Sequence, residues 1–388
     1  MARRARNEAD ESRSLLRHDN LRRAMQVIVQ HPGIATRAEI ARTTGVTAAT
    51  ASSLVAQLID ANLVVEGEQA ASSGGKRATT LHVDGSYYAL GVFVVTPSDI
   101  RAALLDLNAT VITEQRVEGT PTTHIAAIVA IAQQWQHDYG DRLLSIAVQV
   151  QGATDGEAVL ESVAMGWHDT DIAEPISEVF SGPIRLVNDV DAAAVTEALL
   201  DSEPSGLRLF AYMGEGVGAA VTIDGRLLAG KQGRTGEIGH VRSLVGGHDM
   251  RCECGRIGCL EAVASFQAMV GIDFTENTDH DALARHVTAA DPERIDQGAL
   301  ALAQTLSLLS AMLAPREVVL GGAAHVLGEP FLRRVQSVLA DPPRGTLPVP
   351  VRFARQGAAP FAGVGQAALQ IALGLAWGPA QMHPDAGR

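Results

Sequence analysis

The stretches TGEIGH (235–240) and RCECGRIGCLEA (251–262) carry the most specific pattern in this sequence of 388 residues. The chain contains three cysteines, and all of them, Cys252, Cys254 and Cys259, fall within the second stretch. A Cys-x-Cys-x4-Cys spacing with an upstream histidine is typical of a structural zinc site, because Zn²⁺ favours four tetrahedral thiolate and imidazole ligands. The pattern predicts a loop folded around a metal ion. The alternatives are three unrelated buried thiols or a redox switch.

The residues around the cysteines offer a fourth metal ligand and two carboxylates. His240 and His248 are both candidates for the fourth ligand. Glu237 lies three residues before His240, and Glu261 lies two residues after the last cysteine. A metal loop would hold these carboxylates rigidly, and carboxylate oxygens accept hydrogen bonds from hydroxyl groups. The pattern therefore indicates a sugar-like ligand beside the metal loop.

A second polar pair stands at the end of a predicted strand in VNDVDAAA (187–194). Asn188 and Asp189 occupy the position where ligands bind in open α/β sheets. Asp189 would deprotonate a ligand hydroxyl as a general base or simply bind it. The structural alternative is that both side chains cap the helix that starts near residue 190, and the two roles are compatible.

Charge is distributed unevenly between a short N-terminal part and the remainder. The net charge is −13, which argues against a chain wholly devoted to nucleic acid. Residues 1–83 carry 11 Lys+Arg and 8 Asp+Glu, a net of +3, and the remainder carries 20 and 36, a net of −16. This asymmetry predicts a small part that faces a polyanion and a larger acidic part with another task.

No segment indicates export or insertion into a membrane. The basic N-terminus MARRARNEADESRS (1–14) lacks the apolar region of a signal peptide. No run of 18 or more apolar residues occurs. Three clustered cysteines do not make a disulfide framework. We therefore expect a cytoplasmic protein without membrane contact.

The N-terminal part has the pattern of a helix-turn-helix. Apolar residues at helical spacing predict a helix over 20–30, and the HPG that follows ends it. A short helix comes next, with Thr36 as N-cap, Glu39 as capping-box partner and Gly45 as its stop. After a three-residue turn, Thr47 caps a longer helix.

The candidate DNA contacts lie on this longer helix, near it, and on a predicted wing. Small hydroxyl side chains at the start of an exposed helix let the backbone approach a phosphodiester or a groove floor closely. Two short apolar strands within residues 63–83 flank a Gly/Ser loop, which is typical of a β-hairpin wing with a basic tip. The candidates are Arg37, Thr47, Thr50, Ser52, Ser53, Lys76 and Arg77. The alternative is a three-helix packing module with a solvated hairpin.

From about residue 88 onward, predicted strands alternate with helices, which indicates an α/β architecture. Glycine-rich turns in MGEGVGAA (213–220) and LGGAA (320–324) suit a close approach of the backbone to phosphate. The expected helices include 124–137, 190–200 and 298–313. The expected strands are YALGVFVV (88–95), IRAALLDL (100–107), LSIAVQV (144–150), IRLVND (184–189), LRLFAYM (207–213), AAVTIDG (219–225) and REVVLGG (316–322).

These motifs resemble those of the ROK family, whose members include repressors and sugar kinases. The resemblance rests on RTGEIGH with CECGRIGCLEA, and VNDVDAAA, GEGVGAA, VVLGG and FAGVGQAAL fall in the family's order. It covers nearly the whole chain. The N-terminal winged helix-turn-helix, running into SSGGKRATTLHV, resembles the repressor branch. The resemblance implies a winged helix-turn-helix followed by a two-lobed α/β domain with an actin-like, sugar-kinase-like ATPase-type fold.

The resemblance also implies roles for individual residues. His240 would complete a structural Zn²⁺ site with the three cysteines, which leaves His248 in a surface loop. Asp189 matches the catalytic base of the family's kinases. A sugar that touches every matching position would bridge the two lobes of the domain. The implied sugar contacts are Asn188, Asp189, Glu237, His240 and Glu261.

Two departures from the family pattern bear on function. Kinases of the family open the sheet with a strand that ends in Asp-x-Gly-Gly-Thr, whereas this chain has Phe93-Val94-Val95-Thr96. β-Branched side chains obstruct backbone approach to phosphate, and no carboxylate remains to position magnesium. We therefore expect no kinase activity, although Asp189 is retained. The second departure is Ala164, which stands where the family often has a sugar-binding asparagine and indicates a different effector.

The sequence therefore predicts a DNA-binding transcriptional regulator, a sugar-controlled repressor of genes for carbohydrate uptake or catabolism. Residues 1–84 would form the DNA-binding domain, with 1–18 as a flexible basic arm. Residues 85–388 would form the effector and dimerisation domain, with the zinc loop at 240–261. A homodimer or a dimer of dimers would bind a pseudo-palindromic operator. The alternative is a ROK sugar kinase with an added N-terminal domain.

Overall fold

The computed structural model describes residues 18–69, 78–202, 205–228, 230, 235–272, 280–355, 358, 359 and 361–377. The chain divides into two compact units. Unit 1 comprises Met1–Gln149, Asp171–Leu186 and Ala358–Arg388, and unit 2 comprises Val150–Thr170 and Val187–Gly357. Within the described ranges, no helix combines the length and the apolar character needed to cross a membrane.

Unit 1 begins with three helices that share one small core. A helix over residues 18–30 is followed by α2 (Arg37–Thr44) and α3 (Ala48–Asp60). Apolar residues at helical spacing turn toward one another and exclude water, which is the main driving force for this packing. The core residues include Ala24, Met25, Ile28, Ile40, Leu54, Val55 and Leu58.

The expected helix caps are confirmed. The Thr36 hydroxyl accepts a hydrogen bond from the Glu39 backbone N–H at 3.2 Å, and Gly45 ends α2 in the left-handed conformation. The Thr47 hydroxyl accepts from the Thr50 backbone N–H at 3.1 Å. These caps fix the three-residue turn between α2 and α3.

The expected capping-box role of Glu39 is wrong. Its carboxylate accepts hydrogen bonds from the Arg42 guanidinium, at 2.5 and 3.2 Å, and from the Thr43 hydroxyl at 3.3 Å. A guanidinium one turn away competes better than a neutral backbone N–H, because charge-assisted hydrogen bonds are stronger.

The wing is an antiparallel hairpin. Strand β1 (Val64–Gln69) pairs with β2 (Thr79–Val83), and the register shifts between Glu66 and Gln69. The predicted basic tip with Lys76 and Arg77 lies outside the described residues.

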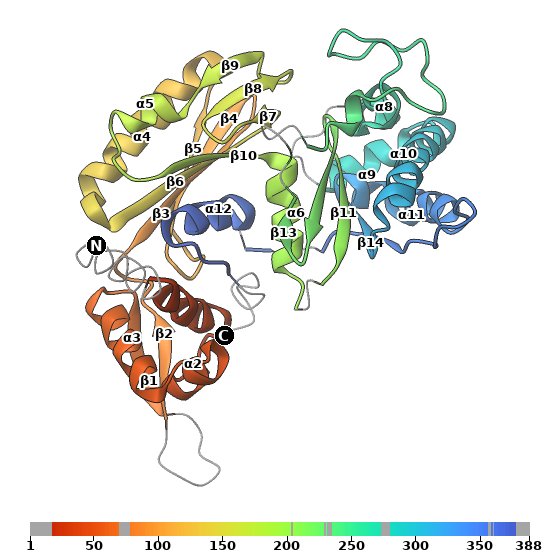
Figure 1. Ribbon diagram of the computed structural model, residues 1–388. Helices are drawn as coiled ribbons and strands as arrows, with labels where there is room; N and C mark the ends of the chain where they lie inside the picture. The colour runs from red at the N-terminus through yellow and green to blue at the C-terminus, as the bar shows by residue number, and fades with distance from the viewer. Residues whose placement is uncertain are drawn as a thin grey trace, which may run out of the picture. The chain divides into compact units, whose positions relative to one another are not determined.

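The larger part of unit 1 is a five-stranded sheet in the order β10-β6-β3-β4-β5 (Figure 1). Strands β3, β4 and β5 are antiparallel neighbours, and β6 runs parallel to β3. Helix α4 (Pro121–Tyr139) and helix α12 (Ala362–Leu373) both pack against β3, and α5 (Ala173–Ser177) packs against α4. The strands are β3 (Ala89–Val95), β4 (Asp99–Leu105), β5 (Val111–Glu118), β6 (Leu143–Val150) and β10 (Ile184–Asn188).

Unit 2 contains a second five-stranded sheet, in the order β13-β12-β11-β14-β15. Helix α6 (Asp189–Leu199) packs on one face, and the main core cluster joins the strands to the later helices (Figure 1). A small sheet holds β7 (Ala153–Thr154), β8 (Ala158–Ser162) and β9 (Trp167–Asp171). The large sheet's strands are β11 (Leu207–Met213), β12 (Val217–Ile223), β13 (Arg226–Leu227), β14 (Glu317–Gly322) and β15 (Val351–Phe353).

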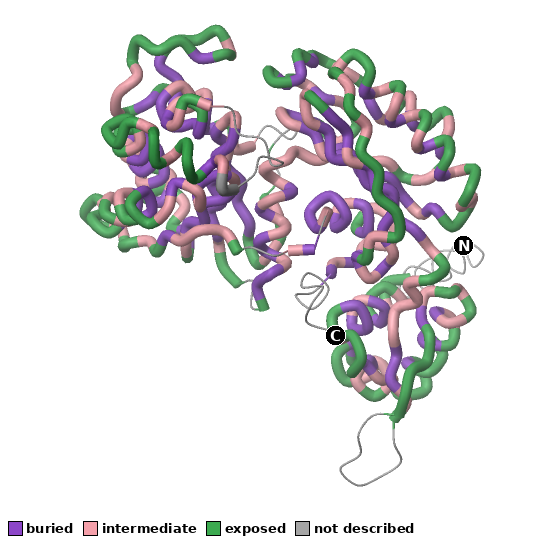
Figure 2. The backbone as a smooth tube through the Cα atoms, turned by 180° about the vertical axis from the view of Figure 1, so that it is seen from behind, coloured by how far each residue is buried: buried purple, intermediate pink, exposed green. Residues whose placement is uncertain are grey.

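The remaining helices of unit 2 lie before the three cysteines, as η3 does, or after them. Burial is concentrated in the strands and in the helix faces that cover them (Figure 2). The elements are η3 (Ile238–His240), α7 (Glu261–Ala264), α8 (Phe266–Val270), α9 (His280–Ala289), α10 (Pro292–Leu313) and α11 (Ala324–Leu339). The strands and helices expected from about residue 88 onward are confirmed, with small differences at their ends.

A buried ion network fixes α6 on its sheet. Glu197 of α6 is only 2% exposed and accepts hydrogen bonds from Arg352 at 2.7 Å and from Arg355 at 2.5 Å. Glu317 of β14 binds Arg352 and Arg208 at 2.8 and 2.7 Å. Arg352 of β15 binds both glutamates, so the network joins α6 to β14 and β15. The first turn of that helix carries Asp189.

Candidate metal centre and adjoining polar site

Four potential metal ligands converge in unit 2. His240, Cys252, Cys254 and Cys259 each offer one ligand atom, and these atoms lie within 4.8 Å of one another. The Nδ1 atom of His240 is 3.8 Å from the Cys252 sulfur, and the sulfurs of Cys254 and Cys259 are 3.7 Å apart. His248, the other candidate, is exposed and does not belong to the set.

These separations fit a tetrahedral zinc ion. Zn–S bonds of about 2.3 Å place two tetrahedral sulfur ligands about 3.8 Å apart, and the Cys254–Cys259 separation is 3.7 Å. Burial raises the pKa of the Cys252 and Cys259 thiols. A metal ion that binds them as thiolates must therefore displace their protons. The four side chains could thus hold a metal.

Backbone conformation brings the three sulfurs together. Gly255 has φ 85° and Gly258 has φ 82°, both in the left-handed region that favours glycine. The Cys252 backbone N–H donates to the Arg256 carbonyl at 2.8 Å. Cys259 is joined to Arg242 by an antiparallel bridge. The loop is therefore held by its own backbone hydrogen bonds.

Glu261 connects the metal cluster to the sheet of unit 2. One carboxylate oxygen lies 3.4 Å from the Cys252 sulfur and 3.8 Å from His240 Nδ1. The other accepts a hydrogen bond from the Val217 backbone N–H at 3.1 Å. A Cβ atom on Gly216 would lie 2.7 Å from that oxygen, so the glycine of the GEGVG turn makes room for the carboxylate.

Asn188 is the N-cap of α6. Its side-chain oxygen accepts hydrogen bonds from the backbone N–H groups of Val190 and Asp191 at 2.9 and 3.1 Å, and its amide donates to the Gly152 carbonyl at 2.8 Å. The capping alternative is therefore confirmed for Asn188. Asp189 is the first residue of the helix and is partly exposed.

All five predicted ligand contacts belong to one unit. Asn188 and Asp189 start α6, Glu237 and His240 flank or form η3, and Glu261 starts α7; each of these residues lies in unit 2. The boundary between the units falls inside β10, so Asn188, the last residue of that strand, is assigned to unit 2, whereas Ile184–Leu186 are assigned to unit 1. That a sugar touching all five positions bridges the two lobes stays a prediction.

Asp191 is a titratable residue that the sequence reasoning missed. Burial, reinforced by the charge of Glu237, raises the pKa of Asp191 to about 6. Its position in the first turn of α6 places it beside Asp189 and brings it under the electrostatic influence of Glu237. The signal available in the sequence was the second aspartate of VNDVD, two residues after the first.

Among the described residues of this unit, two of the buried polar atoms without a hydrogen-bond partner belong to residues close in sequence to the predicted site residues. They are the side-chain oxygen of Gln151 and the hydroxyl oxygen of Thr235. Gln151 precedes Gly152, whose carbonyl binds Asn188, and Thr235 lies two residues before Glu237. Buried polar atoms are usually paired, so these two are candidates for ligand contacts. Each directly precedes a glycine, Gly152 or Gly236, and this was the signal available in the sequence.

The turn between β3 and β4 is filled by the chain's own side chains. The Thr96 hydroxyl lies 2.6 Å from the carboxylate of Asp99, which is 1% exposed and also binds Arg116. The Thr96 carbonyl is bound by the buried His124 at 2.9 Å. Phe93 is fully buried and packs on Trp135 with ring centroids 4.8 Å apart. The side chain of Phe93 is therefore part of the core.

Four of the five predicted DNA contacts that the structure describes are exposed, and Arg37 is half-buried. Thr47, Thr50, Ser52 and Ser53 are all exposed at the start of α3. Arg37 is paired with Glu66 of β1 at 2.7 Å, which ties α2 to the wing.

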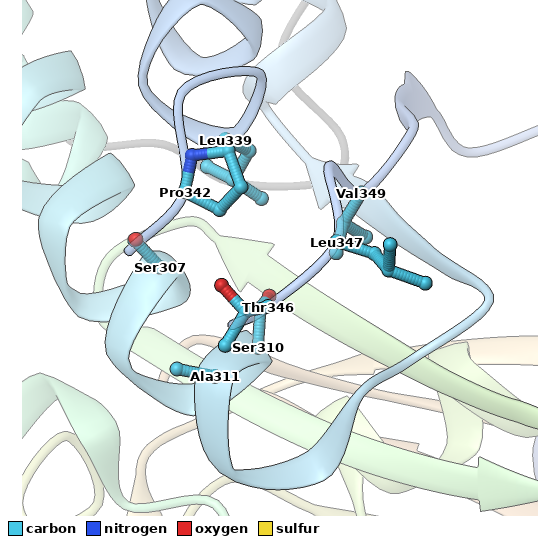
Figure 3. Close-up of a pocket in the computed structure, with 8 residues that line it drawn as sticks. All are labelled: Ser307, Ser310, Ala311, Leu339, Pro342, Thr346, Leu347 and Val349. Atoms are coloured by element: carbon cyan, nitrogen blue, oxygen red, sulfur yellow. The ribbon is translucent and has the colours of Figure 1, made fainter. Parts of the chain in front are cut away.

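A small hollow in unit 2 does not contain any of the predicted site residues. Figure 3 shows Ser307, Ser310 and Ala311 of α10 facing Thr346 and Leu347. Its lining offers hydroxyl groups and apolar side chains, without a carboxylate or an imidazole. It therefore lacks the charged groups that distinguish the polar site beside the metal ligands.

Family models decide which family the chain belongs to. The model of the ROK family matches residues 96–371, more than half of the chain. The chain belongs to the ROK family. A model of the MarR family matches residues 23–78 of the ROK protein, the part that forms the winged helix-turn-helix.

Curated relatives of this ROK protein include several repressors. The xylose repressor of Bacillus spizizenii is 30% identical over 245 residues, which cover 60% of this chain and 62% of the repressor. The N-acetylglucosamine repressor of Escherichia coli O157:H7 is 27% identical over 259 residues, covering 63% and 62%. The match thus spans less than two thirds of these relatives. The xylose repressor of Caldicellulosiruptor bescii is 26% identical, covering 84% of this chain and 88% of its own.

Solved structures share the fold of this ROK protein. A ROK family transcriptional regulator, a homologue of the E. coli MLC protein, has a TM-score of 0.72 at 21% identity and covers 92% of this chain and 98% of its own. A ROK hexokinase from Thermus thermophilus has a TM-score of 0.57 at 27% identity and covers 74% and 98%. The predicted fold, a helix-turn-helix followed by a sugar-kinase-like domain, is therefore confirmed.

Proposed function

We propose that this ROK protein is a transcriptional regulator whose affinity for operator DNA changes when a sugar binds unit 2. The observation that carries the proposal is the presence in one chain of an exposed helix-turn-helix surface and a polar site beside a potential metal centre. Relatives named xylose repressor and N-acetylglucosamine repressor support it. Within the proposal, the regulated genes serve carbohydrate uptake or catabolism, and the protein represses them.

In the proposed DNA complex, the start of α3 enters the major groove. Thr47, Thr50, Ser52 and Ser53 are short enough for the helix backbone to approach the base edges and phosphates. Arg37 remains near the wing through Glu66. Lys76 and Arg77 are proposed to contact the backbone or the minor groove. A homodimer or a dimer of dimers would present two such surfaces to a pseudo-palindrome.

The proposed sugar site uses acceptors on α6 and around the metal ligands. Asp189, Glu237 and Glu261 would accept hydrogen bonds from sugar hydroxyls. His240 would use its Nε2 atom, because its Nδ1 atom faces the Cys252 sulfur. Asn188 already binds the Gly152 carbonyl and caps α6, so it contributes mainly by holding the helix start in place.

The proposed metal is Zn²⁺ with a structural role. His240, Cys252, Cys254 and Cys259 would hold it, and their separations match a tetrahedral set. When bound, the ion would lock the loop that positions Glu261. A four-coordinate Cys3His site has no open position for a substrate, which supports a structural ion over a catalytic one.

The second candidate function is a sugar kinase, favoured by the retained Asp189 and by likeness to a ROK hexokinase. Against it, the turn after β3 carries Thr96, whose hydroxyl and carbonyl are engaged by Asp99 and His124. Phe93 is buried in the core and offers no ligand to magnesium. Phosphoryl transfer needs both phosphate positioning and charge neutralisation. We therefore propose that the chain is not an enzyme.

The proposed organisation divides the chain near residue 84, one residue after β2 ends. Residues 1–84 would form the DNA-binding domain, with 1–18 as a basic arm, and 85–388 the effector and dimerisation domain with the zinc loop at 240–261. Limited proteolysis followed by mass spectrometry tests the division, because cleavage should concentrate near this boundary.

The function is tested with purified protein and DNA selected from a random library. Fluorescence anisotropy should detect binding to the selected DNA, and a panel including D-xylose and N-acetylglucosamine should contain a sugar that changes the affinity. A coupled ATP assay with the same panel should show no turnover. Turnover that disappears in Asp189→Ala, or failure to select any DNA sequence, would contradict the proposal.

A further inference from the structure

Two glutamine side chains form hydrogen bonds with the backbone of the segment that follows α12, one from each side. We call residues Gly374–Trp377 the C-terminal strap. The amide of Gln26, on the helix over residues 18–30, donates to the Ala376 carbonyl at 2.6 Å and accepts from the Ala376 N–H at 2.9 Å. The amide of Gln366, on α12, donates to the Leu375 carbonyl and accepts from the Trp377 N–H, both at 2.9 Å.

The pattern of these bonds is that of an extended chain. Successive residues of an extended chain turn their backbone polar groups to opposite sides. Gln26 takes both groups of Ala376 on one side, and Gln366 takes the groups of Leu375 and Trp377 on the other. Two side chains thus form hydrogen bonds with four of the six backbone polar groups of Leu375, Ala376 and Trp377. The other two groups are the Leu375 N–H and the Trp377 carbonyl.

On the side of Gln366, the strap is firmly held by the rest of unit 1. Gln366 is 7% exposed, Leu375 is 1% exposed and Trp377 is 2% exposed. The Trp377 indole N–H donates to the Leu107 carbonyl at 2.9 Å. Helix α12 is itself bound to β6, because the Ser145 hydroxyl donates to the Ala368 carbonyl at 2.8 Å.

On the DNA-binding side, two described side chains of the helix over residues 18–30 form hydrogen bonds with the strap. Besides Gln26, the Arg22 guanidinium donates to the Gly374 carbonyl at 3.4 Å. The Tyr88 hydroxyl also donates to the Ala61 carbonyl at 3.1 Å, close to where the wing continues into β3. Gln26 therefore makes the shortest bond between the helix over residues 18–30 and the strap.

We infer that Gln26 is a positioning residue that couples the state of the ROK domain to the helix-turn-helix through the strap. The inference rests on the proposed function. The chain returns from unit 2 to unit 1 between Gly357 and Ala358, and α12 and the strap follow at once. A shift of α12 that accompanies sugar binding is thereby transmitted to the helix over residues 18–30.

The physical basis is a difference in bonding between two arrangements. A ligand changes DNA affinity only by its preference for one arrangement over another. When the strap keeps both bonds to Gln26, the first helix must move with α12. Without them, the helix-turn-helix takes the orientation that DNA demands regardless of the sugar.

The test compares Gln26→Met with Gln30→Met in the full chain. Methionine keeps the approximate size of the side chain but has no amide to bind Ala376. Gln30 is exposed on the same helix and provides the matched control. The operator Kd is measured with and without the D-xylose or N-acetylglucosamine that acts on the wild-type chain. We expect the ratio of the two values to fall at least threefold toward one in Gln26→Met and to stay unchanged in Gln30→Met.

A purely structural role would give a different result. It would lower the Tm and weaken operator binding in both conditions without changing their ratio. Site-resolved hydrogen exchange gives an independent readout that needs no sugar. The Ala376 amide should exchange at least tenfold faster in Gln26→Met, whereas the Trp377 amide, bound by Gln366, should keep its protection. If Gln26→Met does not fold, Gln26→Glu retains the acceptor and removes the donor.

The outcomes separate the two proposals. A sugar response that persists at the wild-type ratio in Gln26→Met, or an Ala376 amide that exchanges rapidly in the wild-type chain, would overturn the role of Gln26 and leave the regulator intact. A wild-type chain that binds no selected DNA, or whose binding no sugar changes, would contradict the proposed function and the coupling with it.

Discussion

Glu261 accepts a hydrogen bond from the backbone N–H of Val217 at 3.1 Å, although 44 residues separate them in the chain. The other oxygen of the same carboxylate lies 3.4 Å from the Cys252 sulfur. One side chain thus joins the metal loop to the start of β12. A change in the metal loop should therefore alter the position of Glu261 at the proposed sugar site.

We predict one zinc ion per chain and its loss in Cys254→Ser. Without the ion, the loop loses the constraint that places Glu261, so the Tm should fall and the sugar response should weaken together. Elemental analysis of protein purified without chelators, combined with calorimetry, checks this. His248→Ala is the control, since that exposed histidine should leave the zinc content at the wild-type value. Wild-type protein that contains no zinc would refute the prediction.

Substitution of the proposed sugar acceptors should reduce sensitivity to sugar and spare DNA binding. Glu261→Ala and Asp189→Ala each remove a charged acceptor, a loss of about 1.5–3 kcal/mol of ligand binding. The half-maximal sugar concentration should rise roughly tenfold or more, while operator affinity without sugar stays at the wild-type value. An anisotropy titration measures both quantities. The matched control is Asp249→Ala, in an exposed loop position. A variant that responds at the wild-type concentration would show that its residue does not contact the ligand.

Removal of the charge at Asp191 should stabilise the protein at neutral pH. Because the pKa of Asp191 is raised to about 6 in the folded state from 3.8, its ionisation destabilises the folded state. The protonated carboxyl of Asp191 contributes stability to the folded state that is fully present below pH 4 and is lost as the pH rises through about 6. The free energy of unfolding of Asp191→Asn at pH 7.5 should therefore exceed that of the wild-type chain by a difference on the order of 2–3 kcal/mol. The variant should accordingly unfold at a higher denaturant concentration.

At pH 4 the difference between Asp191→Asn and the wild-type chain should nearly vanish. Urea unfolding across pH 4 to 8 measures it, with Asp169→Asn as an exposed control. A constant difference across this range would show that Asp191 does not titrate as proposed.

Thr235→Val should raise the stability of the sugar-free protein and lower its affinity for sugar. The Thr235 hydroxyl is buried without a partner among the described residues, and such a group costs about 1–3 kcal/mol. Replacing the hydroxyl by a methyl group relieves that cost and removes a potential contact. Thermal unfolding with and without the active sugar checks both effects. A variant that is less stable and equally sensitive to sugar would assign Thr235 a purely structural role.

The wing should contribute affinity without sequence preference. Arg77→Ala is expected to weaken binding to all DNA sequences. The slope of the logarithm of the binding constant against the logarithm of the salt concentration should become shallower by about one unit, as the loss of one phosphate contact predicts. Anisotropy titrations over a range of salt concentrations, with selected and scrambled DNA, measure both quantities. An unchanged affinity and slope would remove this arginine from the interface.

The sequence by itself determined the features that depend on local patterns. Thr36, Gly45 and Thr47 cap and end helices through groups within a few residues, so their roles followed from the types and spacing of the residues. The convergence of the three cysteine sulfurs also followed from spacing, because two glycines turn the loop within eight residues. The family motifs added the choice of His240 over His248.

Only the tertiary structure decided features that depend on long-range contacts. The capping role of Glu39 was wrong because Arg42 competes for its carboxylate. The unit boundary that assigns all five proposed sugar contacts to unit 2 falls inside β10, and no local pattern marks it. The burial of Asp191, the orphaned hydroxyl of Thr235 and the 350-residue contact between Gln26 and Ala376 arise from packing. Which side chains are buried, and which groups pair across hundreds of residues, depends on how the helices and strands pack together. The spacing of residues in the sequence does not determine this packing.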